Sequence, residues 1–326
     1  MDCRGWSEAN SQRRNKNDLG SGAEPCDNQP TSIPCQSHAA PLCREEAMHE
    51  KKYDLVSDSR DSRYLTLRSL QTQQGRSKTG CYIIEGIRHL ARAVEARSAI
   101  HSIFVAPSVL SNHYGQKLAR KLRRQGVPGV RLSHHLYHAL SVANEPQGIG
   151  AVLRQEWVPL KGLNVPHNSL WLAIESIESP GNLGTILRTS EASGVSGIFV
   201  LVDECDPHDP AAVRASMGSL FSQQLIRCSV HEFITWAKSK DVSIVASTPV
   251  GLMNYKDLHY RWPMVLALGR EKRGLSEQLL DAAHFTVRIP MHGLCDSLNI
   301  AVAAGVLLFE MSSQRRWNGS ARERVV

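Results

Sequence analysis

The stretch from Glu175 to Val200, ESIESPGNLGTILRTSEASGVSGIFV, constrains the fold more than any other part of the chain. An apolar run, Leu170 to Ile174, leads into the polar segment SPGNLG, then a helical pattern and a second apolar run. This alternation predicts a βαβ unit whose first loop lies at the carboxyl end of a strand, where α/β folds bind ligands. We expect Pro180, Gly181 and Gly184 to make that loop a tight turn that a ligand can approach closely.

Arg188 follows this loop in the first turns of the expected helix, which favours a site for an anionic or ribose-phosphate substrate. Two later segments add to the pattern. VLALGREKRGLS, from Val265 to Ser276, predicts another strand, loop and helix start, and DSLNIAVAAGVLLFE, from Asp296 to Glu310, predicts a polar start to a long apolar helix.

Taken in order, NLGTILRTSEASG, LGREKRGLS and SLNIAVAAGVLLFE resemble the three motifs of the SpoU (TrmH) branch of the SPOUT RNA methyltransferases. The resemblance covers roughly residues 63–313. It implies an enzyme that uses S-adenosylmethionine to methylate a ribose 2′-hydroxyl and that works as a homodimer. It also implies a deep trefoil knot at the C-terminal end of the catalytic domain, an exception to the rule that chains do not thread loops.

The resemblance supplies the catalytic candidates, which are Arg188, Asn182, Glu271, Ser297 and Asn299. Because arginine is a poor base, we expect Arg188 to fix a phosphate and polarise the ribose hydroxyl. The other four are expected to order Arg188, the loop or the nucleotide. Simpler readings stay open: a surface ion pair of Arg188 with Glu191, a turn residue, a carboxylate at a helix N-terminus, and helix caps.

The cofactor candidates lie at the ends of expected strands and at a helix start, and they are Thr248, Gly269, Ile289 and Leu298. In the resembling family, the motif positions of Gly269, Ile289 and Leu298 bind the methyl donor, with main-chain groups reading the adenine. Thr248 ends another expected strand and is a further candidate. We expect a side chain at Gly269 to collide with an adenosyl group. The alternatives are an ordinary turn glycine and ordinary core packing.

Charge is distributed unevenly along the chain. Residues 63–150 hold 13 Lys/Arg and 3 Asp/Glu, whereas residues 151–326 hold 17 of each and residues 1–62 hold 8 and 11. A positive field confined to one segment predicts a module that faces a polyanion, although a merely solvated basic surface is the alternative. The RNA-binding candidates are Arg88, Lys117, Arg120, Lys121, Arg123, Arg124 and Arg214.

The domain boundaries follow from composition and pattern. Residues 1–62 are polar and predicted to be disordered, and residues 314–326 form a polar C-terminal tail. Residues 63–155 resemble an L30e-like substrate-binding domain, through YIIEGIRHLARAVE and ANEPQGIGAVL. Residues 168–313 alternate apolar strands with amphipathic helices, which predicts an α/β domain with a parallel sheet covered on both faces.

Several function classes are disfavoured. The eight cysteines form no CxxC pair, so no metal site is predicted. No apolar run is long enough to span a bilayer, and the start lacks a secretory signal, which predicts a cytoplasmic protein without a membrane partner. The absence of GxGxxG argues against a nicotinamide dehydrogenase. The basic N-terminal module favours a structured ribosomal RNA loop as the substrate, and transfer RNA is the alternative. The alternative function is a non-catalytic RNA-binding protein in ribosome assembly.

Overall fold

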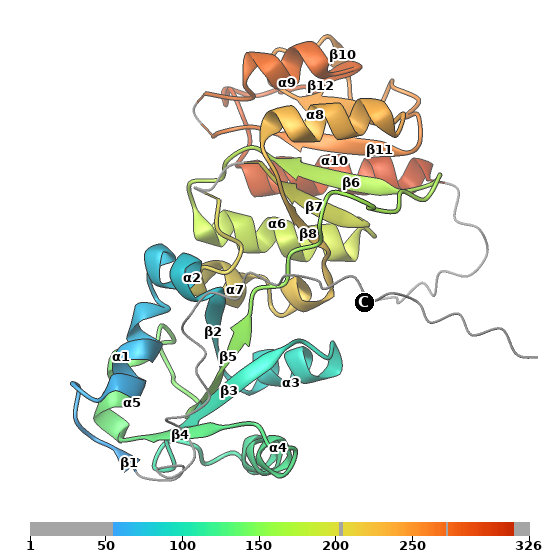
Figure 1. Ribbon diagram of the computed structural model, residues 1–326. Coiled ribbons are helices and arrows are strands. Elements are labelled where there is room, and N and C mark those ends of the chain that lie inside the picture. The colour runs from blue at the N-terminus through green and yellow to red at the C-terminus, as the bar shows by residue number, and fades with distance from the viewer. Residues whose placement is uncertain (1–54, 202–204, 272, 316–326) are drawn as a thin grey trace, which may run out of the picture. The chain divides into compact units, whose positions relative to one another are not determined.

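The computed structural model describes residues 55–201, 205–271 and 273–315 (Figure 1). Most of the predicted N-terminal tail therefore lies outside the described residues, as does the C-terminal segment 316–326. Strand β1 (Leu55–Val56) lies inside the range that was expected to be disordered, which corrects that prediction for residues 55–62. Val56 is 2% exposed, and this burial anchors the strand to the core of the first sheet.

The first sheet belongs to the N-terminal domain and has the strand order β1-β4-β3-β5-β2. Strands β1, β4 and β3 run parallel, and β5 pairs antiparallel with both β3 and β2. Its further elements are α1 (Ser62–Ser69), α2 (Gln73–Thr79), β2 (Cys81–Glu85), α3 (Ile87–Glu95), β3 (Ile100–Val105), α4 (His113–Arg124), β4 (Gly129–Leu132), α5 (His134–Leu140) and β5 (Ile149–Arg154).

Alternation along β2 divides the core of this domain into two layers. Ile83 packs in the cluster that includes Tyr64 of α1 and Tyr137 of α5. Its neighbour Ile84 packs in the cluster that includes Leu90 of α3 and Leu118 of α4. The mixed sheet is therefore covered on both faces, as expected for a small α/β domain.

The second sheet forms the C-terminal domain, and all its strand pairs are parallel in the order β10-β12-β9-β11-β6-β7-β8. This confirms the predicted α/β class. The elements are β6 (Leu170–Ile174), α6 (Pro180–Ala192), β7 (Gly197–Val200), α7 (Pro210–Ala215), the 3-10 helix η2 (Ser219–Ser222), β8 (Leu225–Arg227), α8 (Val230–Ser239), β9 (Ser243–Ser247), β10 (Met253–Asn254), β11 (Met264–Leu268), α9 (Glu277–Ala282), β12 (Phe285–Arg288) and α10 (Ile300–Gln314).

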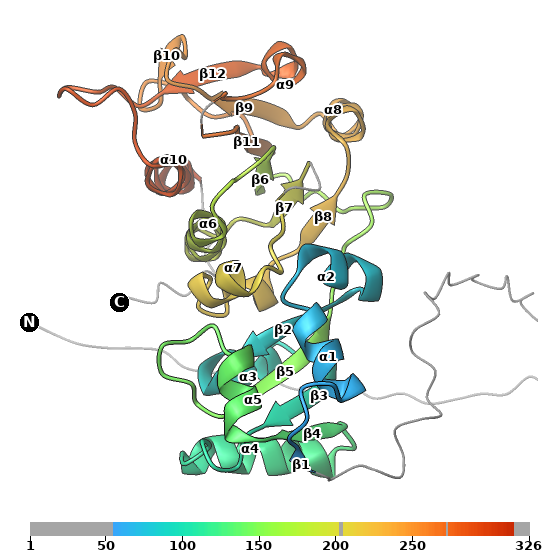
Figure 2. The same cartoon turned by 90° about the vertical axis from the view of Figure 1, so that its left-hand side faces the viewer.

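Both faces of this sheet are buried under helices. Leu172 of β6 belongs to the same core cluster as Leu187 of α6 and Leu308 of α10. Trp171 points to the opposite face, where its ring lies 6.2 Å from that of Trp236 in α8. Figure 2 shows α6 and α10 on one side of the sheet and α8 on the other. Continuous apolar strands are the sequence pattern that such double coverage requires.

The segment SPGNLG was expected to form a tight turn before the helix. In the structure it is the N-cap and the first residues of helix α6, which corrects that prediction. Ser179 caps α6 and accepts a hydrogen bond from the Asn182 amide at 3.4 Å. Pro180 occupies the first helical position, where its missing N–H costs nothing. A Cβ at Gly184 would lie 2.3 Å from the Ala212 carbonyl oxygen, so this glycine allows close packing of α6 on α7.

The trefoil knot stays a prediction, because strand order and pairing do not establish how the chain threads. None of the helices in the described ranges is long and apolar enough to cross a membrane.

Candidate active site

Four strands of the second sheet deliver their carboxyl ends to one edge. Strands β12, β9, β11 and β6 are neighbours in that order and run parallel. Register places Ile174 opposite Leu268, and the Glu175 amide donates to the Leu268 carbonyl at 3.0 Å, so the loops after β6 and β11 begin side by side. The three sequence motifs therefore supply loops or helix starts at the edge where open α/β sheets bind ligands.

A chain of hydrogen bonds joins one residue from each motif. Asn182 Nδ2 donates to Glu271 Oε1 at 2.6 Å, and Asn182 Oδ1 accepts from Asn299 Nδ2 at 3.2 Å. Both ends of the Asn182 amide are thus occupied, and its orientation is fixed. Asn299 also caps α10, because its Oδ1 accepts from the Ala301 amide at 2.9 Å. The helix-cap alternative therefore describes Asn299, while its predicted role toward Arg188 or the nucleotide stays a prediction.

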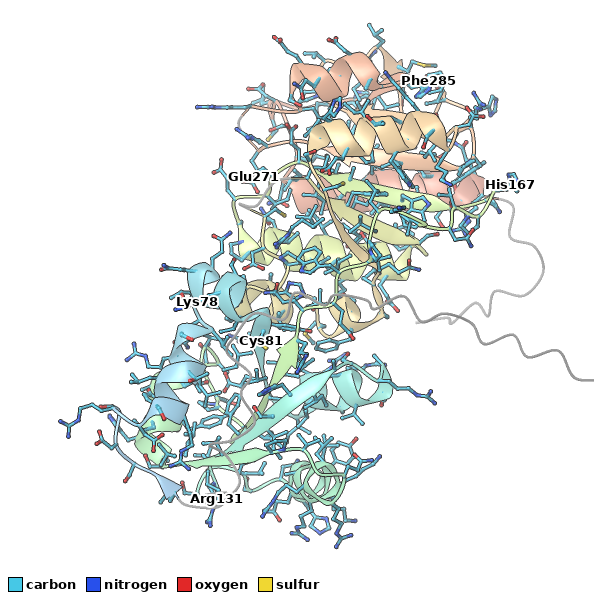
Figure 3. All side chains as sticks on the ribbon, viewed as in Figure 1. Lys78, Cys81, Arg131, His167, Glu271 and Phe285 are labelled. Carbon is cyan, nitrogen blue, oxygen red and sulfur yellow. The ribbon has the colours of Figure 1, made fainter. Side chains whose placement is uncertain are left out.

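Glu271 stands on a tight loop between β11 and α9, at the surface of the molecule (Figure 3). The loop closes through paired backbone hydrogen bonds between Arg270 and Gly274, at 2.9 and 3.0 Å. A Cβ at Gly269 would lie 2.3 Å from the Gly274 carbonyl carbon and the Leu275 nitrogen. A glycine is therefore required at position 269 by the close approach of the chain to itself, whether or not an adenosyl group binds there.

Glu175 is a further structural residue of the site that the sequence did not single out. It is 4% exposed at the end of β6, and its Oε2 accepts a hydrogen bond from the Ser276 amide at 2.8 Å. Ser276 is the first residue before α9, so Glu175 fixes the far end of the loop that carries Glu271. Its only signal in the sequence is an acidic residue directly after a buried strand.

Arg188 lies apart from this hydrogen-bonded group. It is six residues beyond Asn182 in α6, which rotates it by about 240° around the helix axis. Its side chain is exposed, and within the described ranges its guanidinium makes neither a hydrogen bond nor an ion pair, including with Glu191. Ser297 is likewise exposed and without a hydrogen bond in that part of the chain. The structure thus brings together three of the five catalytic candidates.

The four cofactor candidates lie along the same edge. Thr248 follows β9, and its amide donates to the Val287 carbonyl of β12 at 3.0 Å. Ile289 follows β12 and packs against the core, while Leu298 is 37% exposed. Val250 and Leu252, in the loop after β9, are each 85% exposed. This edge offers apolar side chains and strand-end main-chain groups, which is the surface that an adenosyl group requires.

No cluster of three or more His, Cys, Asp or Glu side chains that could bind a metal occurs in the described residues.

The basic candidates fall into two groups. Helix α4 buries Leu118 and Leu122 and exposes the five residues Lys117, Arg120, Lys121, Arg123 and Arg124. Arg88 of α3 and Arg214 of α7 are exposed at a different place, where both line one cavity. The Arg214 guanidinium donates to the Val142 carbonyl at 2.8 Å. The sequence identified both groups but could not show that two of the arginines converge.

Comparison with known proteins identifies the families that the two domains match. Residues 169–309 match the SpoU rRNA Methylase family, and residues 65–151 match the MRM3-like substrate binding domain. An uncharacterised tRNA/rRNA methyltransferase of Synechocystis is 31% identical over 78% of this chain and 91% of its own length. A 23S rRNA (uridine(2479)-2′-O)-methyltransferase of Streptomyces viridochromogenes is 29% identical over 79% and 91%.

A solved structure carries the same fold. The AdoMet-bound rRNA methyltransferase from Sinorhizobium meliloti is 29% identical, with a TM-score of 0.72 over 80% of this chain and 97% of that one. The matches extend through both domains and include all three motif segments. The chain belongs to the SpoU methylase family, as its three motifs predicted.

Proposed function

We propose that this protein transfers a methyl group from S-adenosylmethionine to a ribose 2′-hydroxyl of ribosomal RNA. The observation that carries the proposal is the hydrogen-bonded chain from Glu271 through Asn182 to Asn299, which unites the three motifs at the ligand-binding edge of the sheet. Two relatives support the substrate class, since they are 2′-O-methyltransferases of 23S rRNA, from Streptomyces viridochromogenes and Bacillus subtilis.

The chemistry divides between donor and protein. S-adenosylmethionine supplies a methyl group activated on a sulfonium when it is bound. Transfer of this methyl group to the ribose oxygen would release the donor as the thioether S-adenosylhomocysteine and the hydroxyl proton to water. Thr248, Gly269, Ile289 and Leu298 would hold the donor. Holding oxygen, carbon and sulfur in line can lower the barrier by up to roughly 10 kcal/mol.

We assign Arg188 to binding the RNA substrate. Its guanidinium stays protonated at neutral pH and can donate paired hydrogen bonds to a phosphate while it polarises the neighbouring hydroxyl. The Asn182–Glu271–Asn299 group has a different task, which is to hold the motif loops in one geometry. We assign Ser297, two residues before Asn299, to contact with the nucleotide.

The N-terminal domain is assigned to RNA binding. Segment 63–150 holds 13 Lys/Arg against 3 Asp/Glu, and α4 exposes five of these cations on one helix. Such a surface attracts a phosphate backbone and makes binding dependent on salt. We also place the protein in the cytoplasm, where ribosomal RNA is found; the free thiols of the described cysteines are compatible with a reducing compartment.

A homodimer is part of the proposal, because α10 has an uncovered apolar face. Val302 and Phe309 lie seven positions apart, on the same side of the helix, and each is 53% exposed. Arg188 is exposed on α6, the helix against which α10 packs. Apolar residues in such a stripe favour a partner surface, and a second copy would bring a further chain to Arg188.

Light scattering tests the dimer. The paired substitution Val302→Asp and Phe309→Asp should convert a dimer to a monomer, whereas Leu65→Asp, at a site in α1 that is 51% exposed, should not. A wild-type monomer at micromolar concentration contradicts this part of the proposal.

The function itself is tested by two measurements on the full chain. Calorimetry with S-adenosylmethionine should show donor binding, and RNA from cells lacking the protein should accept labelled methyl groups. If the protein binds the donor but transfers no methyl group to any RNA fraction, or if it shows neither donor binding nor transfer, the result favours the alternative of a non-catalytic RNA-binding protein in ribosome assembly.

A further inference from the structure

A cavity of about 190 Å³ lies beside the sheet of the N-terminal domain, and helix α7 closes one side of it. Its walls come from β2 and α3, from the segment after α5, and from Pro210, Val213 and Arg214. A cavity of about 150 Å³ is enough for a benzene ring, whereas pockets for drug-sized ligands begin near 300 Å³. The volume therefore suits one planar ring system.

The inner wall is apolar and aromatic. Phe104 and Tyr137 pack with their ring centroids 5.9 Å apart, and both line the cavity together with Ile83 and Leu140. The Tyr137 hydroxyl already donates to the Ile149 carbonyl at 3.0 Å, so its proton is not available to a ligand. These side chains supply packing surface and not hydrogen bonds, which suits an aromatic guest.

One wall carries a fixed carboxylate. Glu85 Oε1 accepts from the Ser141 hydroxyl at 2.5 Å, and Oε2 accepts from the Val142 amide at 3.2 Å. The two oxygens have about four acceptor positions, of which Ser141, Val142 and Tyr137 can occupy at most three. At least one position stays open, and a carboxylate can only accept. The wall therefore selects a guest with N–H donors and disfavours an anion inside the cavity. Burial lowers the pKa of His89, also in the lining, so this imidazole is neutral at pH 7 and adds no positive charge there.

The rim has the opposite character. Arg88 and Arg214 come from different domains, both are exposed, and both line the cavity together with one exposed carboxylate, that of Glu145. Arg214 donates to the Val142 carbonyl while Glu85 accepts from the Val142 amide, so the rim segment is held from two sides. Two cations at the mouth of a preformed apolar cavity are placed to meet phosphates on either side of an inserted group.

We propose that this cavity receives one unstacked base of the substrate RNA, with its N–H donors toward Glu85 and its flanking phosphates at Arg88 and Arg214. The inference rests on the proposed function for the identity of the polymer. Proteins that read RNA sequence take unstacked bases onto aromatic side chains and bond their edges. The cavity would thus contribute to the choice of nucleotide from outside the methyl-transfer site.

The first test asks whether the cavity recognises a base. The probe is guanosine 5′-monophosphate, which carries N–H donors on its base, and the matched probe without a base is ribose 5-phosphate. Methyl resonances of Ile83, Leu140 and Val213 report on the cavity directly. The nucleotide should shift these resonances and ribose 5-phosphate should not. Equal shifts from both probes would overturn base recognition.

The second test fills the cavity. Ala143 lies in the lining and is half-buried, so Ala143→Phe should abolish the nucleotide shifts and weaken binding of ribosomal RNA at least about fivefold. Ala99→Phe, at a half-buried position of the same domain outside the lining, is the control and should change neither. A folded Ala143→Phe protein with unchanged nucleotide shifts and RNA affinity would refute the inference.

A substitution at the rim provides an independent check, should Ala143→Phe fail to fold. Arg88→Gln should lower RNA affinity and reduce its salt dependence, while Arg131→Gln, exposed in the same domain but outside the lining, should do so less. Equal losses of RNA affinity from Arg88→Gln and Arg131→Gln would overturn the role of the rim arginines. Because nucleotide binding needs no methyl transfer, loss of the proposed function and loss of this inference are distinguishable.

Discussion

Removal of Arg76 should destabilise the protein by about 3 kcal/mol, because this arginine is a buried charge whose two carboxylate partners lie in the other domain. Its side chain is 2% exposed, yet three of its nitrogens donate hydrogen bonds: Nε to Asp206 at 2.7 Å, Nη2 to Asp209 at 3.2 Å and Nη1 to the Leu70 carbonyl at 3.0 Å. Helix α2 is thereby tied to the segment that leads into α7.

The magnitude follows from what Arg76→Ala leaves behind. Breaking a buried ion pair by removing one partner costs about 3–5 kcal/mol when the other charge stays buried. Asp206 and Asp209 keep 12% and 27% of their side-chain surface exposed, so water can solvate them in part and the lower end applies. Loss of the packed arginine stem adds to the cost.

Urea unfolding of the full chain gives the free energy directly. The matched control is Arg261→Ala, which breaks an ion pair to Asp241 of similar length, 2.6 Å, but with 59% and 79% of the two side chains exposed. An exposed pair contributes about 0–1 kcal/mol. Equal losses from Arg76→Ala and Arg261→Ala, or a loss below about 1 kcal/mol from Arg76→Ala, would refute the reasoning from burial.

Three further predictions concern catalysis, pH and RNA. Arg188→Ala should abolish methyl transfer and leave donor affinity within a few-fold, measured by calorimetry; retained turnover removes Arg188 from the mechanism. Burial lowers the pKa of His208 to about 4 despite the opposing Asp206 carboxylate, with Arg227 and Arg76 lowering it further. As the pH falls, His208 therefore becomes protonated at a higher pH in the unfolded chain than in the folded one. The free energy of unfolding should keep its full value above about pH 6.5 and fall by up to about 3 kcal/mol toward pH 4. A His208→Asn protein whose free energy of unfolding depends on pH in the same way contradicts this. Charge reversal at Arg123 and Arg124 should weaken RNA binding and flatten its salt dependence, and an unchanged slope moves the RNA surface elsewhere.

The sequence predicted the elements whose pattern is strong. The apolar run from Leu170 to Ile174 coincides with β6, and the segment beginning at Val265 contains most of β11. The motif helix α6 starts at Pro180, inside the segment that was expected to be a turn. Strands β8 and β10 were not predicted, because runs of three and two residues carry no periodicity. Helix α2 was missed for a related reason: its sequence, QQGRSKT, contains no large apolar residue, and the residue it buries is Arg76.

The sequence identified candidate residues for the site but not the hydrogen bonds between them. The motifs identified Asn182, Glu271 and Asn299, yet only the fold shows that Asn182 bonds to both of the others. A pattern of residue types cannot locate a partner that lies 89 or 117 positions away in the chain. For the same reason the sequence did not identify Glu175 as the residue that holds the Ser276 amide, nor the convergence of Arg88 and Arg214 on one cavity.

The central claim is best tested by nucleoside mass spectrometry of RNA from cells lacking this protein, after incubation with the protein and S-adenosylmethionine. Arg188→Ala protein, treated in the same way, is the control. We predict a single nucleoside in ribosomal RNA whose ribose gains a 2′-O-methyl group with wild-type protein only. A methyl group on a base, or no new methylated nucleoside despite donor binding, would contradict the proposed reaction.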